Sequence, residues 1–340
     1  MIKPNSQNSN HQLLDAQKDY SNTQLNDRKI KTLSTNSFNP SLPTQLDSHL
    51  SLTSLPISLD YLRFGASSLR RKNFDLLTTI LFSQVDCKAI NKPWHPDPKM
   101  PKNKKYQNRI VSRKGIVFGY TKRAKYRGVN TRYVYDIMID FTGAYLANLS
   151  LLEQIKLIQY ISNYFKLECH RIDIAVDDYS RKLFPVNQMI IAYLNDCSYG
   201  FQVIDDSYLD IIDNKLVGTL GIGSRLSSFF VRIYTKHQYF IRWETELKKK
   251  KAKSLFDKLS SFDSEDSSKI SFIKSIQIAL IEAAMGDIDF RDNSVFGNRK
   301  YARKSKTNRL SFWENTLNTI FSFIENKGDS NHLKSSQIKA

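Results

Sequence analysis

The chain has 340 residues, a formal net charge of +18 and 41% hydrophobic residues. This length allows one large or two medium domains with a sizeable core, and the excess of positive charge predicts a polyanionic partner. The sequence has neither the apolar core of a secretory signal nor a run near the roughly 18 apolar residues that span a bilayer, so we expect a soluble, cytoplasmic protein without a membrane partner. Three widely spaced cysteines argue against a disulfide framework and a zinc site, and we expect them to be buried.

The first part of the chain is polar. Residues 1–54 are rich in Asn, Ser, Gln and Thr, and their only aromatic residues are Tyr20 and Phe38. Such a segment cannot bury enough apolar surface to offset the entropy lost when it becomes ordered. We therefore predict a disordered tail here and a second one at 329–340.

Ordered structure is predicted to begin with a strand at 56–65, PISLDYLRFG, and a short helix at 74–82. A basic block follows. Between Lys99 and Arg132 the chain carries twelve lysines or arginines and no acidic residue. A charge run can be only a solvated face, but one this one-sided predicts contacts with phosphates. The residues of this block that we expect to bind DNA are Lys122, Arg123, Lys125 and Arg127.

The middle of the chain predicts strands interrupted by helices. A strand at 109–121 should pair with another at 133–143, and Ser150 and Glu153 form a capping box that opens an amphipathic helix at 150–165. The further elements are a strand at 170–178, a helix at 185–196 that opens with proline, and strands at 218–225, 229–236 and 241–248.

The last part of the chain predicts helices. A lysine run at 248–253 and a polar break at 260–268 precede two helices at 270–286 and 311–326, which are separated by a basic segment at 291–309. We expect this basic segment to share in DNA binding. The whole pattern indicates an α+β fold, in which a mainly antiparallel sheet carries helices on one face and a C-terminal helical part follows.

Three of the predicted strands carry carboxylates or a tyrosine at alternating positions. Because residues two apart in a strand share a face, Asp173 should lie opposite apolar neighbours in its strand, and so should Glu244 and Glu246 in theirs. Like charges on neighbouring strands repel unless a cation lies among them, and carboxylate oxygens suit Mg²⁺ or Mn²⁺. The spacing predicts a divalent-metal site, although solvent-facing residues paired with arginine or lysine would have the same spacing.

Tyr234 lies on the corresponding face of its strand, between Arg232 and Lys236. A tyrosine oxygen can attack phosphorus, and the two basic side chains can stabilise the charge that develops. Most of the 17 tyrosines must be structural, so spacing alone makes Tyr234 no more than a candidate nucleophile. The glycine-bracketed turn GIGSR at 221–225 would let the backbone approach DNA, and we expect its Arg225 to bind DNA. The turn lacks the lysine of a Walker loop, and taken alone it is typical of a strand end.

Three of these motifs, HRIDIAVDD, GTLGIGSRLSSFFVRIYTK and RWETELK, resemble the replication initiation factor family in order and spacing. This family comprises the rolling-circle initiators of pT181-type staphylococcal plasmids and relatives in filamentous phages and integrated elements. The resemblance spans residues 56–325, with a specific core at 171–248. It implies a fold related to the HUH nucleases, with a catalytic nicking domain at 55–253 and a C-terminal helical region at 254–328.

The resemblance also implies a chemistry. The family nucleophile, the tyrosine of R-I-Y-x-K, matches Tyr234, and the family's metal-binding carboxylates match Asp173, Glu244 and Glu246, with Asp60 on the first strand as an addition. The H-x-H pair of the HUH nucleases does not occur in this sequence. The implied activity is a metal-dependent endonuclease that nicks and closes origin DNA through a 5′-phosphotyrosine and a free 3′-hydroxyl primer. A host helicase, a polymerase and a second copy of the chain are candidate partners.

Two other functions are compatible with the sequence at this point. A tyrosine recombinase also forms a phosphotyrosine, but it requires a helical catalytic domain with an Arg, Lys and His cluster and no metal. A non-enzymatic DNA-binding regulator would account for the positive charge and would leave Tyr234 and the carboxylates unexplained.

Overall fold

The structure, a computed structural model, describes residues 56–82, 87–97, 105–127, 130–200, 204–212, 215–236, 239–262, 269–292 and 307–325. The predicted tails at 1–54 and 329–340 lie outside the described residues, and so does much of the two basic segments, at 98–104, 128–129 and 293–306. All described residues belong to one compact unit, Leu50–Ala340.

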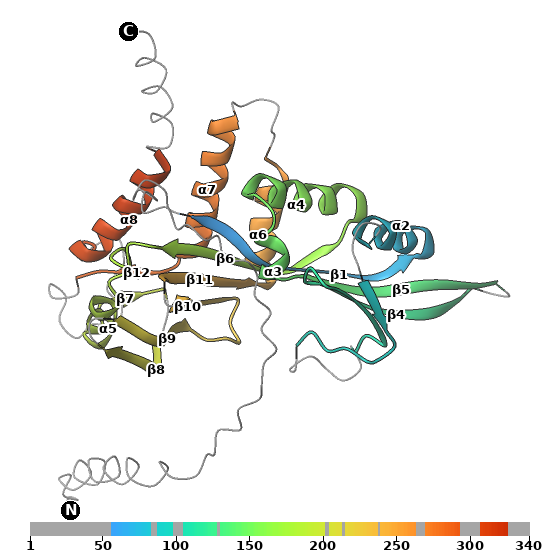
Figure 1. Cartoon of the computed structure of the whole chain (residues 1–340), viewed down its shortest axis with the longest axis horizontal. Helices are drawn as coiled ribbons and strands as arrows, with labels where there is room; N and C mark the ends of the chain where they lie inside the picture. The colour runs from blue at the N-terminus through green and yellow to red at the C-terminus, as the bar shows by residue number, and fades with distance from the viewer. Residues whose placement is uncertain are drawn as a thin grey trace, which may run out of the picture. The chain divides into compact units, whose positions relative to one another are not determined.

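The elements of this unit are labelled in Figure 1. The strands are β1 (Ile57–Arg70), β2 (Cys87–Ile90), β3 (Asn108–Ser112), β4 (Ile116–Arg127), β5 (Asn130–Phe141), β6 (Glu168–Asp178), β7 (Ser198–Tyr199), β8 (Ile204–Ile212), β9 (Lys215–Gly223), β10 (Phe229–Lys236), β11 (Phe240–Lys248) and β12 (Asp289–Phe290). The helices are α2 (Arg71–Phe82), α3 (Gly143–Leu146), α4 (Leu151–Phe165), α5 (Val186–Leu194), α6 (Lys249–Ser260), α7 (Lys269–Met285) and α8 (Ser311–Glu325).

Ten of these strands form one sheet in the order β2-β3-β4-β5-β1-β6-β11-β10-β9-β8, and a small second sheet pairs β12 with β7. Each neighbouring pair in the large sheet runs antiparallel. The predicted α+β class with a mainly antiparallel sheet is confirmed. The order places β6 between β1 and β11, so strands that are far apart in the sequence meet at the centre of the sheet.

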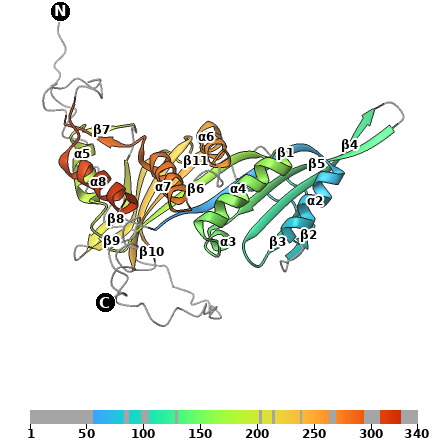
Figure 2. The ribbon, with the colours of Figure 1, turned by 90° about the horizontal axis from the view of Figure 1, so that it is seen from above.

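Helices cover one face of the sheet, as Figures 1 and 2 show for α2, α4, α6, α7 and α8. The apolar residues of the central strands point to this side. Ile174 of β6 is fully buried, and Trp243 of β11 stacks on Trp313 of α8 with ring centroids 5.9 Å apart. Thr245, the next residue of that parity, donates its hydroxyl to the Ala284 carbonyl of α7 at 2.9 Å. The predicted alternation therefore holds in β6 and β11, and it fixes which side chains face away from the helices.

Helix α4 begins where the sequence predicts. Ser150 is its N-cap, and the Ser150 hydroxyl oxygen accepts a hydrogen bond from the Glu153 backbone N–H at 3.3 Å. In return, Glu153 accepts a hydrogen bond from the Ser150 backbone N–H at 2.7 Å. These reciprocal bonds satisfy backbone donors that the first helical turn leaves without intrahelical partners.

Several elements differ from the predicted ones. The predicted strand at 109–121 is two strands, β3 and β4, because the chain turns at Gly115, whose φ of +97° is a left-handed conformation that favours glycine. The short strands β2, β7 and β12, and the edge strand β8, are not among the predicted elements. The lysine run at 248–253 opens a helix, α6, whose buried Leu255 and Leu259 pack toward the core.

The C-terminal helices belong to the same hydrophobic core as the strands. The division into a catalytic part at 55–253 and a helical part at 254–328 stays a prediction about function. Of the three cysteines, only Cys169 is buried; Cys87 is exposed because it lies on the edge strand β2, and Cys197 is half-buried. Among the described residues, no helix has the length and apolar character that crossing a membrane requires.

Candidate functional site

The face of the sheet opposite the helices carries the charged side chains, and we call it the polar face. It is formed at the centre of the sheet by Asp60, Tyr61 and Arg63 of β1, Asp140 of β5, Arg171, Asp173 and Asp177 of β6, Arg232, Tyr234 and Lys236 of β10, and Arg242, Glu244, Glu246 and Lys248 of β11. The carboxylates of β6 and β11 are buried, and so is Arg242, whereas the side chains of Arg171, Arg232 and Lys248 are partly exposed. The short acidic groups thus lie beneath a basic layer.

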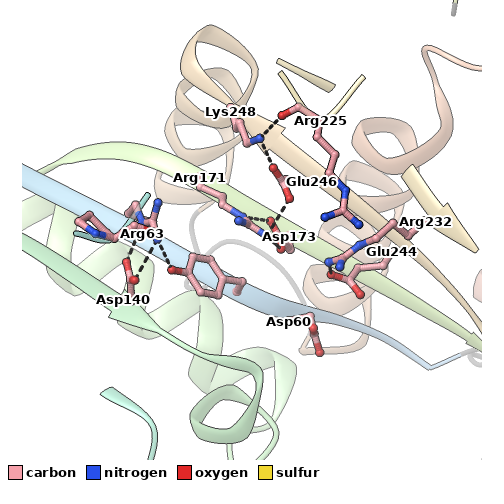
Figure 3. A network of polar contacts seen from close by, with 12 residues as sticks. Asp60, Arg63, Asp140, Arg171, Asp173, Arg225, Arg232, Glu244, Glu246 and Lys248 are labelled. Carbon is pink, nitrogen blue, oxygen red and sulfur yellow. Dashed lines mark hydrogen bonds and ion pairs between the residues drawn. The ribbon is translucent and has the colours of Figure 1, made fainter. Parts of the chain in front are cut away.

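Asp173 and Glu246 lie directly opposite each other on β6 and β11. Both carboxylates contact the same guanidinium nitrogen, Arg171 Nη2, at 2.5 Å from Asp173 Oδ2 and 2.8 Å from Glu246 Oε2 (Figure 3). Lys248 forms a further ion pair with Glu246. The two strands are therefore adjacent, as predicted, and their carboxylates converge on one cation.

Asp173 is only 1% exposed. Burial raises the pKa of its carboxyl to about 7, against the lowering effect of Arg171, and the charges of Glu246 and Glu244 raise it further. A raised pKa means that the ionised carboxylate is costly to hold in the folded protein. A cation with more charge than a guanidinium would favour the ionised form more strongly.

The chemistry of this pair fits a divalent metal. Carboxylate oxygens are the ligands that Mg²⁺ and Mn²⁺ prefer, and Mg²⁺ commonly takes one or two carboxylates and completes its shell with water and phosphate oxygens. The Arg171 guanidinium occupies the position between Asp173 and Glu246, so a metal would bind there by displacing it. Within the part of the chain that the structure describes, no three Asp, Glu, His or Cys side chains form a ready metal-binding group.

Glu244 has different partners from Glu246. Its Oε2 accepts a hydrogen bond of 2.7 Å from the hydroxyl of Tyr234. Its Oε1 forms an ion pair with Arg232, which lies directly opposite it on β10 (Figure 3). Burial and the charge of Glu244 raise the pKa of Tyr234. The phenol is therefore protonated at neutral pH, and Glu244 is placed to accept its proton when the oxygen attacks an electrophile.

Asp60 lies apart from the Asp173 and Glu246 pair. A register shift between Leu59 and Tyr61 inserts Asp60 as an extra residue in β1, and such bulges redirect a side chain. Asp60 Oδ1 lies 2.7 Å from Arg242 Nη1 and 3.9 Å from the Lys236 ammonium. The structure thus groups Asp60 with the cations next to Tyr234, and its role as a metal ligand stays a prediction.

The expected DNA-binding residues lie in two places. Lys122, Arg123 and Lys125 are exposed on β4; Arg127 is the last residue of that strand, and its side chain is outside the described ones. Arg225 is exposed in the turn that follows β9, as expected for a strand-end turn.

Arg225 lies next to the carboxylates of β11. Its backbone carbonyl accepts a hydrogen bond from the Lys248 ammonium at 2.6 Å (Figure 3). Its guanidinium lies 5.5 Å from the ring centroid of Phe230.

The structure adds residues that the sequence analysis does not identify. The guanidinium of Arg171 lies over the Tyr61 ring, 4.6 Å from its centroid, and the Tyr61 hydroxyl accepts a hydrogen bond from Arg63 at 2.6 Å. Arg63 also donates two bonds to Asp140 on β5, at 2.8 and 3.0 Å. The alternation in LDYLRFG would place Tyr61 with Arg63, but their link to Arg171 depends on the pairing of β1 with β6.

A search of the solved structures found a fold similar to this one in a rolling circle replication initiator protein from Geobacillus stearothermophilus. The two chains have a TM-score of 0.52 and 15% sequence identity, and the match covers 79% of this chain and 97% of that chain. No protein-family model and no curated protein sequence matched the chain. The likeness is one of fold, and it extends over nearly the whole of the initiator chain.

Proposed function

We propose that the protein is a rolling-circle replication initiator that nicks one strand of origin DNA with Tyr234 as the nucleophile. The observation that carries the proposal is the 2.7 Å hydrogen bond from the Tyr234 hydroxyl to Glu244, a buried carboxylate two residues from the Asp173 and Glu246 pair. The fold likeness to a solved initiator and the net charge of +18 support it.

In the proposed reaction, Glu244 takes the phenol proton as the Tyr234 oxygen attacks the scissile phosphorus. The new bond joins the tyrosine to the 5′ phosphate, the bond from phosphorus to the 3′ oxygen breaks, and this oxygen leaves as a 3′-hydroxyl after taking a proton from water. Arg232 and Lys236 stabilise the negative charge on the phosphoryl oxygens. A Mg²⁺ or Mn²⁺ ion held by Asp173 and Glu246 would polarise the phosphodiester when bound.

This assignment changes the role of one carboxylate. The family resemblance matches Glu244 with a metal ligand, whereas its contacts with Tyr234 and Arg232 favour a role as the base for the nucleophile. Origin DNA is the proposed substrate, and the proposal extends to a helicase and a polymerase that use the 3′-hydroxyl and to a second copy of the chain.

The test is a covalent adduct. End-labelled oligonucleotides that tile the replicon encoding the chain are incubated with the protein and Mn²⁺, and we expect a denaturant-resistant adduct joined at the 5′ side of the nick. Tyr234→Phe removes only the hydroxyl and should abolish the adduct. Tyr164→Phe, at an exposed tyrosine of α4, is the matched control and should form it normally.

The same assay separates the alternatives. A regulator would form no adduct with any oligonucleotide, and a tyrosine recombinase would form one in the presence of a chelator. An adduct that persists at the normal rate in Tyr234→Phe would show that another tyrosine is the nucleophile.

A further inference from the structure

Strands β4 and β5 extend past their neighbours in the sheet. They pair with each other as far as Arg127, whereas β3 pairs with β4 only to Tyr120 and β1 pairs with β5 only to Val134. Beyond these points no other described strand flanks them, and Figure 2 shows the two strands running on by themselves. We call residues 121–127 and 130–133 the ribbon.

The ribbon is exposed and long enough to enter a DNA groove. Its side chains from Lys122 to Tyr126 are all exposed, with Tyr126 at 80%. The seven residues of its β4 strand span roughly 20 Å at about 3.3 Å each. The major groove of DNA is about 12 Å wide and admits a two-stranded ribbon.

The charges of the ribbon do not favour folding. It contains five lysines or arginines and no acidic residue, and Lys125 lies directly opposite Arg132. Like charges opposite each other destabilise a strand pair, and an isolated two-stranded ribbon is only marginally stable in water. A bound polyanion would remove this repulsion.

Strand alternation places this pair of charges on the polar face. Arg132 lies an even number of residues before Asp140 on β5, and the pairing of β4 with β5 is continuous, so Lys125 shares that face. The aromatic residues Tyr126 and Tyr133 have the opposite parity. Proteins that hold single strands stack bases on aromatic side chains, so the face with Lys125 and Arg132 suits the phosphates of a duplex better than unpaired bases.

We infer that the ribbon enters the major groove of duplex DNA beside the nick site, with Lys125 and Arg132 on the phosphates. The inference rests on the proposed function, because the duplex is the origin DNA that flanks the strand held at Tyr234. Lys125 and Arg132 point to the same face of the sheet as Tyr234, so the protein would hold the flanking duplex and the scissile strand together.

The test measures binding in the Tyr234→Phe background, which prevents cleavage. Affinity for an origin duplex is measured over a series of salt concentrations. The two proteins compared are Tyr234→Phe alone and the double variant, which carries Lys125→Gln and Arg132→Gln in the same background. The slope of log K against log salt is negative, and each phosphate contact adds about 0.9 to its magnitude. The magnitude of the slope should therefore be smaller by about 2 in the double variant. Lys125→Gln alone should lower it by about half as much.

Two controls make the result specific. Lys156→Gln with Lys166→Gln makes the same charge change at exposed residues of α4 and its C-cap, and it should leave the slope unchanged. Single-stranded DNA of the same sequence should lose less affinity than the duplex. An unchanged slope for the double variant, or an equal loss on single-stranded DNA, would overturn the inference.

The two proposals can fail separately. If wild-type protein forms the covalent adduct but the slope does not change, the ribbon inference is wrong and nicking stands. If the slope falls but no adduct forms with any oligonucleotide, the ribbon binds duplex DNA and the proposed nicking is wrong.

Discussion

Replacing Arg171 with glutamine tests whether the Asp173 and Glu246 pair needs a cation. In the wild type, one guanidinium nitrogen contacts both carboxylates, at 2.5 and 2.8 Å. The glutamine side chain would keep a hydrogen-bond donor but no charge, so two buried carboxylates would face each other across β6 and β11. Leaving a buried charge without its partner costs about 3–5 kcal/mol.

We expect the lower end of that range, about 3 kcal/mol, because the Arg171 side chain is 22% exposed and Lys248 still pairs with Glu246. In a domain of roughly 150–250 residues, each kcal/mol lowers Tm by about 2–4 °C, so the variant should melt at least 6 °C or so below the wild type. Mn²⁺ at a concentration about one hundred times its Kd should raise the free energy of unfolding of the variant by about 2.7 kcal/mol.

The loss should depend on pH. Burial raises the pKa of Asp173 to about 7, above its ordinary value of 3.8, and Arg171 opposes that rise. A carboxyl with a raised pKa favours the folded state while it is protonated, and this contribution is lost as the pH rises through about 7. Without Arg171 the pKa of Asp173 should lie higher still, so the loss of stability of Arg171→Gln relative to the wild type should be larger at pH 8 than at pH 5.5.

The assay is thermal unfolding at both pH values, with Mn²⁺ and with a chelator. Arg71→Gln is the control, because the ion pair of Arg71 with Asp75 is exposed and contributes little. We expect Mn²⁺ to raise the Tm of Arg171→Gln more than that of the wild type, where the metal must displace the guanidinium. Equal stability of variant and wild type at pH 8, or an equal effect of Mn²⁺ on both, would refute the reasoning.

Three further predictions concern the nucleophile, the core and a helix cap. Glu244→Gln should slow adduct formation by about 10²–10⁴-fold near neutral pH. The difference in rate should shrink at high pH, where the Tyr234 phenolate forms without a base, and a defect that does not change with pH would contradict the role of Glu244 as the base. Trp243→Ala should lower the free energy of unfolding by about 3–5 kcal/mol in denaturant titrations, because Trp243 is fully buried against Trp313; a loss below about 1 kcal/mol would contradict this packing. Ser150→Ala should cost about 1 kcal/mol in the same titration, and no change would mean that the capping box does not stabilise α4.

Local patterns in the sequence determine much of this protein. Alternation alone places Asp173, Glu246 and Tyr234 opposite the apolar residues of their strands, because the side chains of a strand point to its two faces in turn whatever the strand pairs with. The capping box of α4 is equally local, since its two partners are Ser150 and Glu153, three residues apart. The sequence also shows directly that basic residues are in excess and that they are concentrated between residues 99 and 132.

The tertiary structure decides which of these side chains meet. Tyr234 lies opposite Arg242, yet it bonds Glu244, and the bulge at Asp60 turns this carboxylate to Arg242. The protrusion of the ribbon likewise depends on where β1 and β3 stop pairing. Strand order, register and bulges result from packing and hydrogen bonding between segments far apart in the chain, so the face of each residue is a local property, whereas its partner is not.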